Sequence, residues 1–129
     1  MYHARVEADF SAAHFLSHYG GKCEKLHGHN YKVRLWARGE KLDEGGMLVD
    51  FSLLKKALKE TCAVLDHSNL NDMAIFQNDP SAERIARFIF DSVSEKLGGL
   101  GIESSLLGAV DVFETESSMA RYEASQTGL

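Results

Sequence analysis

The chain has 129 residues, which predicts one domain and leaves no room for a second. Its 14 Lys and Arg against 19 Asp and Glu give a formal charge of −5, so it lacks the basic field that a protein binding nucleic acid or anionic membranes needs. Hydrophobic residues make up 44% and charged residues 26%, a balance typical of globular proteins that excludes wholesale disorder. The apolar runs are too short for a transmembrane helix.

Two strands are expected in the N-terminal third of the chain. Residues 2–10 alternate between apolar and polar side chains, and residues 27–38 do the same, as half-buried strands do. Residues 17–22 contain a Gly pair and read as the loop between them. The apolar triplet Met47–Val49, after Gly45 and Gly46, predicts a short return strand.

Two helices are expected next. Asp50 or Ser52 can cap the first, and Asp79 can cap the second with Pro80 at its first position. Apolar residues recur at helical spacing in the first helix at Leu54, Leu58, Cys62 and Leu65, and in the second at Ile85, Phe88, Ile89, Val93 and Leu97. Glycines at 98, 99 and 101 end the second helix. Cys62 is expected to be a core residue.

The chain returns to strand near its end. Val110, Val112 and Glu114 share one face of a strand, and a weaker strand follows at residues 119–124. The order strand, strand, helix, helix, strand, strand predicts an α+β domain with an antiparallel sheet.

The histidines are the unusual feature, because five of the six fall within the first 29 residues. His27 and His29 lie two residues apart and so share one face of a strand. His14, placed just after the first strand, reaches the same point if the two strands form a hairpin. Three imidazoles with one open position are what a catalytic zinc ion requires, whereas a solvated turn with His14 on the surface is the alternative. His3 and His18 have no partner at ligand spacing and are expected at the surface.

Four further residues could carry chemistry. Cys23 could complete a closed zinc site or act as a free thiol whose pKa is lowered by nearby cations. Asp66 and His67 follow the first helix and form either its C-terminus or a proton relay. Glu114 lies on an apolar strand face, where a carboxylate needs N–H donors from a ligand or a salt bridge.

Several segments, in this order, resemble the superfamily of 6-pyruvoyl-tetrahydropterin synthases and 6-carboxy-tetrahydropterin synthases. The matching segments are Phe10–His14, Cys23–Tyr31, Val49–Phe51, Leu65–Asn71, Pro80–Glu83 and Phe113–Thr115. The resemblance implies the tunnelling fold (T-fold), with four antiparallel strands, two helices on one face, and assembly into trimer-based rings, usually hexamers with active sites shared between chains.

The resemblance also implies roles for these residues. His14, His27 and His29 would hold zinc, and Cys23 would be the catalytic base. Asp66 and His67 would be a second proton-handling pair. Glu114 would anchor the pterin ring, with help from groups around Ser81 and Thr115, although Ala82 stands where many relatives have a hydroxyl residue.

The spacing of Cys23 from the two following histidines resembles the bacterial branch of the superfamily. That branch converts 7,8-dihydroneopterin triphosphate to 6-carboxy-tetrahydropterin, acetaldehyde and triphosphate on the route to queuosine. The alternatives are the animal-type 6-pyruvoyl-tetrahydropterin synthase reaction, a folate-type cleavage of dihydroneopterin that uses Glu24, and a zinc-stabilised pterin-binding module without catalysis. The cysteine content and an N-terminus without a secretory signal predict a cytoplasmic protein.

Overall fold

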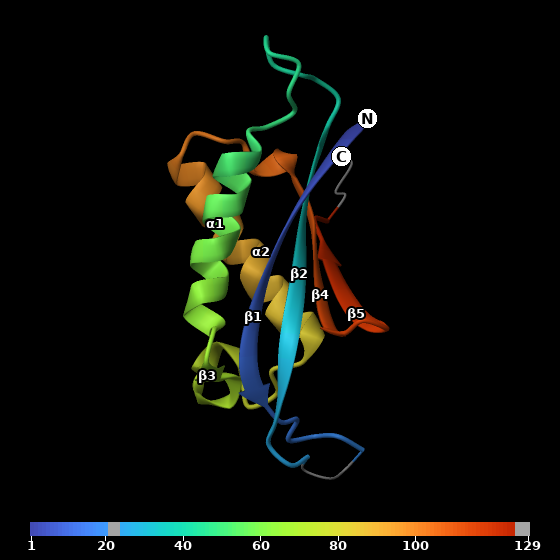
Figure 1. The fold of residues 1–129 in the computed structure, drawn as a ribbon, viewed down its shortest axis with the longest axis vertical. Coiled ribbons are helices and arrows are strands. Elements are labelled where there is room, and N and C mark those ends of the chain that lie inside the picture. Colours follow the sequence, from blue (N-terminus) through green and yellow to red (C-terminus); the bar gives the residue numbers. More distant parts are fainter. Residues whose placement is uncertain (21–23, 126–129) are drawn as a thin grey trace.

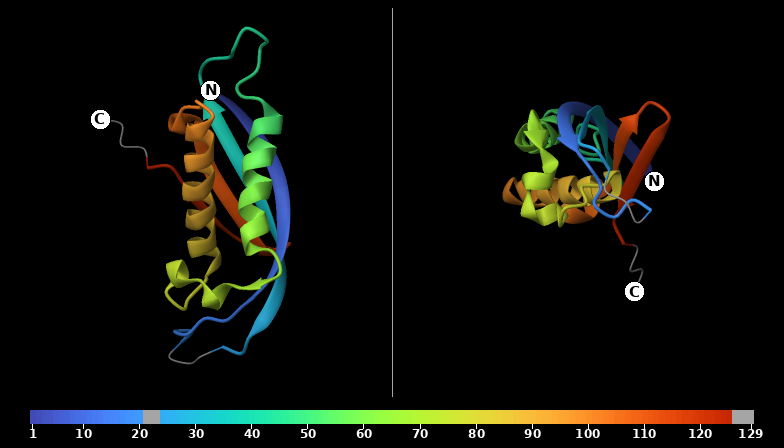
Figure 2. Two further views of the ribbon diagram at one scale, coloured as in Figure 1. Left: turned by 90° about the vertical axis from the view of Figure 1, so that its left-hand side faces the viewer. Right: turned by 90° about the horizontal axis from the view of Figure 1, so that it is seen from below.

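A computed structural model describes residues 1–20 and 24–125 and shows a twisted sheet with two helices packed on one of its faces (Figure 1 and Figure 2). The helices are α1 (Phe51–Leu65) and α2 (Ala82–Gly99). The strands are β1 (Tyr2–His14), β2 (His27–Gly39), β3 (Ser68–Asn69), β4 (Leu107–Thr115) and β5 (Ser118–Glu123). Short 3-10 turns span Leu70–Asp72, Ala74–Phe76 and Ser104–Leu106.

The sheet has the strand order β3-β1-β2-β4-β5. The four expected strands pair antiparallel, which confirms the predicted α+β class and is the strand arrangement expected of a T-fold. A fifth strand, the two-residue β3, adds a parallel pair beside Ala12 and Ala13 at the end of β1. It follows directly from the end of α1, so it brings residues 66–69 to the edge of the sheet.

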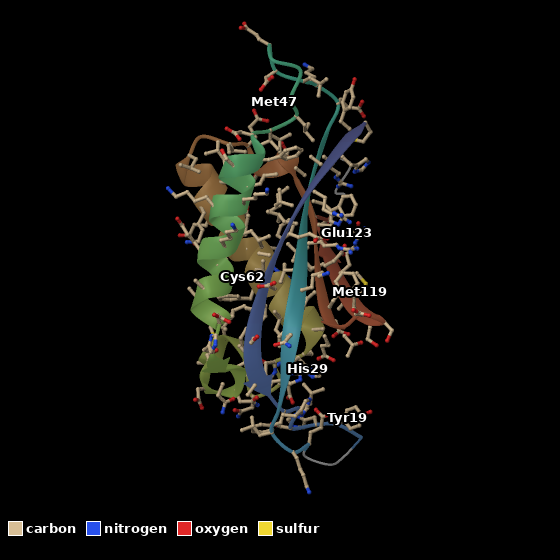
Figure 3. The ribbon with its side chains drawn as sticks, in the orientation of Figure 1. Tyr19, His29, Met47, Cys62, Met119 and Glu123 are labelled. Carbon is tan, nitrogen blue, oxygen red and sulfur yellow. The ribbon has the colours of Figure 1, made fainter. Side chains whose placement is uncertain are left out.

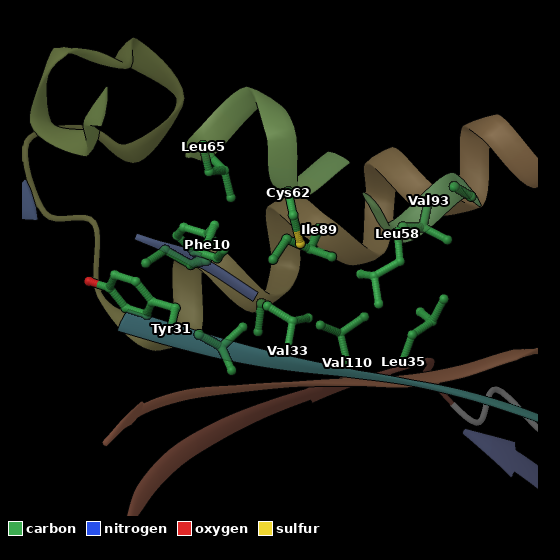
Figure 4. Close-up of a cluster of buried hydrophobic side chains, with 14 of the residues drawn as sticks. Phe10, Tyr31, Val33, Leu35, Leu58, Cys62, Leu65, Ile89, Val93 and Val110 are labelled. Carbon is green, nitrogen blue, oxygen red and sulfur yellow. The ribbon is translucent and has the colours of Figure 1, made fainter. Parts of the chain in front are cut away.

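The core lies between the helices and the sheet (Figure 4). Leu58 and Cys62 of α1 and Ile89 of α2 are buried against apolar side chains of the central strands. Leu35 of β2 and Val110 of β4 face the helices, and their neighbours Arg34 and Asp111 point to the other face, as the period of two predicts. Cys62 is thus a core residue, and burial raises the pKa of its thiol to about 12.

The predicted strand at Met47–Val49 is wrong, because the structure has a turn at residues 44–45 followed by a bend at 48–49, and no strand. The carboxylate of Asp43 accepts hydrogen bonds from the backbone N–H groups of Gly45 and Met47, and the Asp43 N–H donates to the Met47 carbonyl. These bonds occupy the backbone groups that a strand would pair. Gly46 adopts φ +81°, which a side chain would strain.

The predicted start of α2 at Asp79 is also wrong. The N-cap is Ser81, whose hydroxyl accepts a hydrogen bond from the Arg84 N–H at 3.2 Å, and Pro80 precedes the cap instead of standing inside the helix. Asp79 is unavailable as a cap because its carboxylate binds Ser17 and His18. The first helix begins as expected, with Asp50 accepting from the Ser52 N–H.

A last feature of the fold concerns helix length and polarity. In the part of the chain that the structure describes, no helix combines the length and the apolar character needed to span a bilayer.

Candidate metal and active site

Three histidines meet at one end of the β1–β2 hairpin (Figure 3, where His29 is labelled). His14 is the last residue of β1, not a residue beyond it as expected, and it lies opposite His27 in the antiparallel register. Because His29 is two residues farther along β2, the three imidazoles share the helix-facing side of the sheet. Their ligand atoms all lie within 4.8 Å of one another. We call His14, His27 and His29 the histidine cluster.

Backbone carbonyls fix the orientation of two of these rings. His14 Nδ1 lies 2.8 Å from the Pro80 carbonyl oxygen, and His27 Nδ1 lies 2.8 Å from the Lys25 carbonyl oxygen. Since a carbonyl oxygen can only accept, each Nδ1 carries the hydrogen and each Nε2 keeps its lone pair. Metal-binding histidines typically have this arrangement.

His14 is the most constrained member of the cluster. It is only 1% exposed, so the alternative that placed it on the surface is wrong. Its Nε2 is a buried polar atom without a hydrogen-bond partner. Buried polar atoms are nearly always satisfied, and an orphaned imidazole lone pair facing two other imidazoles suits a metal ion. The residues present therefore fit a metal ion.

Glu114 of β4 lies beside the cluster. Its Oε1 is 3.6 Å from His14 Nε2, which is beyond hydrogen-bond length, and its side chain is 29% exposed. Burial lowers the pKa of His29, although the charge of Glu114 opposes the shift. The neutral imidazole that a metal needs is thereby favoured at His29.

A groove of about 570 Å³ runs from the cluster onto the outer face of the sheet. Its lining includes His29, Lys32, Arg34, Glu114 and Thr115. We call it the Glu114 groove. The Thr115 hydroxyl is exposed and accepts from the Ser117 N–H at 3.3 Å. The groove could hold a ligand that presents N–H donors to Glu114.

Tyr31 supports the cluster from the core side, a role that the sequence did not reveal. Its ring stacks on Phe10 at 4.7 Å between centroids and meets the rings of His14 and His29 edge-on at 5.9 and 5.4 Å. These contacts limit the rotation of both imidazoles. Burial raises the pKa of the Tyr31 hydroxyl, so this group stays protonated.

Asp66 and His67 form a hydrogen-bonded pair, with Asp66 Oδ2 and His67 Nδ1 2.8 Å apart. The other oxygen of Asp66 accepts from the Ser11 N–H at 2.9 Å, and this bond, with the bond to His67, lowers the pKa of Asp66. His67 has φ +55° and a side chain that is 83% exposed. The hydrogen bonds of the pair thus run to the outer edge of β1, and His67 lines a pocket of about 490 Å³ together with His29.

The remaining predicted site residues lie in the connecting segments. Glu24 Oε1 accepts from the Leu16 N–H at 3.0 Å, and the Glu24 N–H donates back to the Leu16 carbonyl. Ser81 caps α2, next to the Pro80 carbonyl that holds His14. Cys23 lies outside the described residues.

His18 is at the surface as expected, but it has a partner. Its Nδ1 lies 2.7 Å from Asp79 Oδ2, across 61 residues of sequence. His18 and Asp79 therefore join the segment after β1 to the segment before α2, a link that no local pattern reveals.

A second buried polar cluster lies on the opposite face of the sheet. Asp111 accepts from Trp36 Nε1 at 2.8 Å and from Arg121 Nε and a terminal nitrogen of Arg121 at 2.6 and 3.0 Å. Burial alone would raise the pKa of Asp111, but these hydrogen bonds outweigh it and lower the pKa. We call Asp111, Trp36 and Arg121 the aspartate cluster.

Comparison with known proteins gives consistent results. Residues 3–125 match the family model for 6-pyruvoyl tetrahydropterin synthase. A 6-carboxy-5,6,7,8-tetrahydropterin synthase of Synechocystis is 40% identical over 121 residues, covering 90% of this chain and 88% of the relative. One from Bacillus subtilis is 37% identical over 125 residues, covering 92% and 83%. The structure of 6-pyruvoyl tetrahydropterin synthase from Caenorhabditis elegans superposes with a TM-score of 0.82 at 28% identity, covering 96% of each chain.

Proposed function

Because the chain belongs to the 6-pyruvoyl tetrahydropterin synthase family, whose members are lyase-type enzymes acting on pterins, we propose that it is a zinc-dependent 6-carboxy-5,6,7,8-tetrahydropterin synthase. Its substrate would be 7,8-dihydroneopterin triphosphate, and its products 6-carboxy-tetrahydropterin, acetaldehyde and triphosphate, on the route to queuosine in the cytoplasm. The observation that carries the proposal is the histidine cluster, with the orphaned Nε2 of His14 beside Glu114.

His14, His27 and His29 would hold the zinc ion. When bound, zinc would act as a Lewis acid on the hydroxyl groups of the substrate side chain. One ring nitrogen of each histidine lies close to those of the other two. The carbonyls of Pro80 and Lys25 hold the rings of His14 and His27 in the tautomer that leaves Nε2 available to the metal.

The pterin ring would bind in the Glu114 groove. The carboxylate of Glu114 accepts hydrogen bonds from the amino-pyrimidine edge, and Thr115 of the same groove contributes a further contact. Groups around Ser81, the N-cap of α2, would contribute from outside the lining of the groove. Lys32 and Arg34 line the same groove. Arg34 Nε lies 2.7 Å from Glu7 Oε1, so Lys32 would be the groove's main contribution toward offsetting the net charge of −5 before an anionic triphosphate, with further cations supplied by a neighbouring chain.

Proton transfer would fall to Cys23 and to the Asp66–His67 pair. The Cys23 thiolate removes a proton from the side-chain carbon of the substrate, and His67, oriented by Asp66, relays a second proton. The hydrogen bond from the outer edge of β1 to Asp66 supports the proposal that the pair would serve a site shared with a neighbouring chain.

A homo-oligomeric ring, built from trimers and reaching a hexamer, fits the free edges of the sheet. Among the described residues, β5 pairs with β4 alone, and β3 covers the outer side of β1 only at Ala12 and Ala13. Open strand edges favour pairing between copies.

Product analysis by mass spectrometry tests the proposal. Zinc-loaded protein is incubated separately with 7,8-dihydroneopterin triphosphate and with dihydroneopterin. Acetaldehyde and a carboxylated pterin from the triphosphate support the proposal, and the absence of both refutes it. Cys23→Ala should abolish the reaction and keep the zinc, whereas loss of the metal with the thiol would make Cys23 a ligand.

Glu24 supports a second candidate, the cleavage of dihydroneopterin to 6-hydroxymethyl-dihydropterin. Its carboxylate is held by the Leu16 N–H, and its charge contributes to the pKa of His29, so it lies near the cluster. Glu24→Ala should selectively remove this product. An unchanged yield would exclude Glu24 from the mechanism.

A further inference from the structure

Two segments far apart in the sequence are tied together beside His14. One is Phe15–His18, which follows β1, and the other is Asn78–Pro80, which precedes α2. We call the two segments, together with Asn71, the His14 bracket. Pro80 supplies the carbonyl that accepts from His14 Nδ1 at 2.8 Å, so the position of this segment sets the orientation of the ring.

Asn71 joins the two segments through its side-chain amide. Its Oδ1 accepts from the Phe15 N–H at 2.9 Å, and its Nδ2 donates to the carbonyls of Phe15 at 2.9 Å and Asn78 at 3.1 Å. The amide thus pairs with both backbone groups of the residue that follows His14. It also holds the chain two residues before Pro80.

Asp79 makes the second connection. Its Oδ1 accepts from the backbone N–H groups of Ser17 and His18, and its Oδ2 lies 2.7 Å from His18 Nδ1. The Ser17 hydroxyl donates to the Asn78 carbonyl at 2.8 Å. These bonds secure the residue directly before Pro80.

The backbone of this segment is also strained. Gln77 and Asn78 have φ +52° and +63°, in the left-handed region that residues with side chains seldom adopt. Such conformations persist where the surrounding contacts over-determine them, and they concentrate at functional sites. Here the contacts that hold the segment are made by Asn78 and Asp79, the two residues directly before Pro80.

We propose that Asn71 and Asp79 are positioning residues for His14: by fixing the Pro80 carbonyl, they keep the imidazole protonated at Nδ1 and present Nε2 to the metal ion. The proposal rests on the metal site of the proposed function. It adds that the metal affinity of the cluster is set partly by two residues that touch neither metal nor substrate.

The tautomer of His14 gives the first test, and it needs neither metal nor turnover. Because His14 Nδ1 lies 2.8 Å from the Pro80 carbonyl oxygen, long-range ¹⁵N–¹H NMR at about pH 8 should show a single Nδ1–H tautomer in the metal-free wild type. Asn71→Ala should give a mixture of tautomers. An Asn71→Ala spectrum identical to that of the wild type would overturn the proposal.

Zinc affinity, measured by competition with a chromophoric chelator, gives the second test. Asn71→Ala and Asp79→Ala should bind zinc about 10- to 100-fold more weakly, the effect typical of residues that orient metal ligands. The matched control is Asp43→Ala. Asp43 also holds a loop through backbone N–H groups, those of Gly45 and Met47, but at the other end of the sheet, where Met47 is labelled in Figure 3. The control should bind zinc as the wild type does.

Two results would contradict the proposal: wild-type zinc affinity in Asn71→Ala, or an equal loss in Asp43→Ala, which would indicate general destabilisation. If Asn71→Ala does not fold, Asp79→Asn decides the question. It keeps an acceptor for Ser17 and loses the charge opposite His18, so it should show a smaller loss of affinity, and unchanged affinity would refute the role of the bracket. Since neither test measures turnover, a failure here is distinguishable from a failure of the proposed reaction.

Discussion

The two buried polar clusters on opposite faces of the sheet differ in how fully their hydrogen bonds are made. In the aspartate cluster, Asp111 receives three hydrogen bonds, from Trp36 and Arg121. In the histidine cluster, each of two rings has a partner at Nδ1, but the buried Nε2 of His14 has none. Both clusters are built from neighbouring strands, so the fold alone does not account for the difference.

The contrast separates a structural role from a functional one. A buried carboxylate whose oxygens already accept three hydrogen bonds has little acceptor capacity left for a ligand, and removing one of its partners destabilises the fold. A buried imidazole without a partner at Nε2 costs folding free energy, and a metal ion would offset that cost. We therefore expect changes in the histidine cluster to affect ligands, and changes in the aspartate cluster to affect stability.

The largest effect is expected at His29. His29→Ala removes one of the three proposed metal ligands from a half-buried position, so the protein should lose stoichiometric zinc while its circular dichroism spectrum stays that of the wild type. Metal analysis after dialysis measures this. Full zinc occupancy in the variant would show that the cluster is not the metal site.

Glu114→Gln should weaken pterin binding about 10- to 100-fold, because a hydrogen bond to a charged acceptor contributes about 1.5–3 kcal/mol. Zinc occupancy should not change, since Glu114 is not one of the three ligands. Fluorescence titration with a non-reacting pterin measures the affinity. Loss of zinc together with the pterin would instead assign Glu114 to the metal.

Asp111→Asn should have the opposite result: it should lower stability and leave zinc and pterin binding unchanged. It leaves Arg121 without its charge partner, and the free energy of unfolding should fall by about 2 kcal/mol. The expected loss is smaller than for a fully buried pair because the Arg121 side chain is 44% exposed. Urea denaturation measures the change. Zinc and pterin affinity should match those of the wild type. A loss of either affinity would contradict the assignment of a purely structural role to the aspartate cluster.

The smallest effect is a pH dependence. Since the folded state lowers the pKa of Asp111, its contribution to stability is present above the unfolded pKa of about 3.9 and is lost as the pH falls through the folded value. The difference in unfolding free energy between wild type and Asp111→Asn should therefore shrink as the pH falls below about 4. The carboxyl groups of Asp66 and Asp79 are present in both proteins, so their contributions to the free energy of unfolding cancel in this difference. A constant difference down to pH 2 would contradict the assigned pKa shift.

Local periodicity predicted most of the fold. Alternation placed Val33 and Leu35 correctly in the core, and the spacing of His27 and His29 predicted their common face. The local pattern failed at Met47–Val49, where the Asp43 side chain binds the Met47 N–H, and at the start of α2, where the Asp79 carboxylate binds Ser17 and His18 and cannot cap the helix. In both cases a side-chain or tertiary hydrogen bond outweighed a local preference.

The three histidines of the candidate site were predictable from the sequence, but the hydrogen bonds that position them were not. The His-Gly-His spacing is local, whereas the bonds of Asn71 to Phe15 and of Asp79 to His18 span 56 and 61 residues. Asp111 stands where alternation predicts the outward face of a strand, and it is buried because Trp36 and Arg121 cover it. Such long-range polar contacts have no periodic signature in the sequence.

The coordination of zinc in the loaded protein tests the central claim most directly. X-ray absorption at the zinc edge should show three imidazole nitrogens at about 2.0 Å and one exchangeable oxygen, the open site that a catalytic metal needs. A sulfur ligand at about 2.3 Å, with no exchangeable position, would show that Cys23 closes the site. The protein would then be a zinc-stabilised pterin-binding module, and the proposed lyase activity would be wrong.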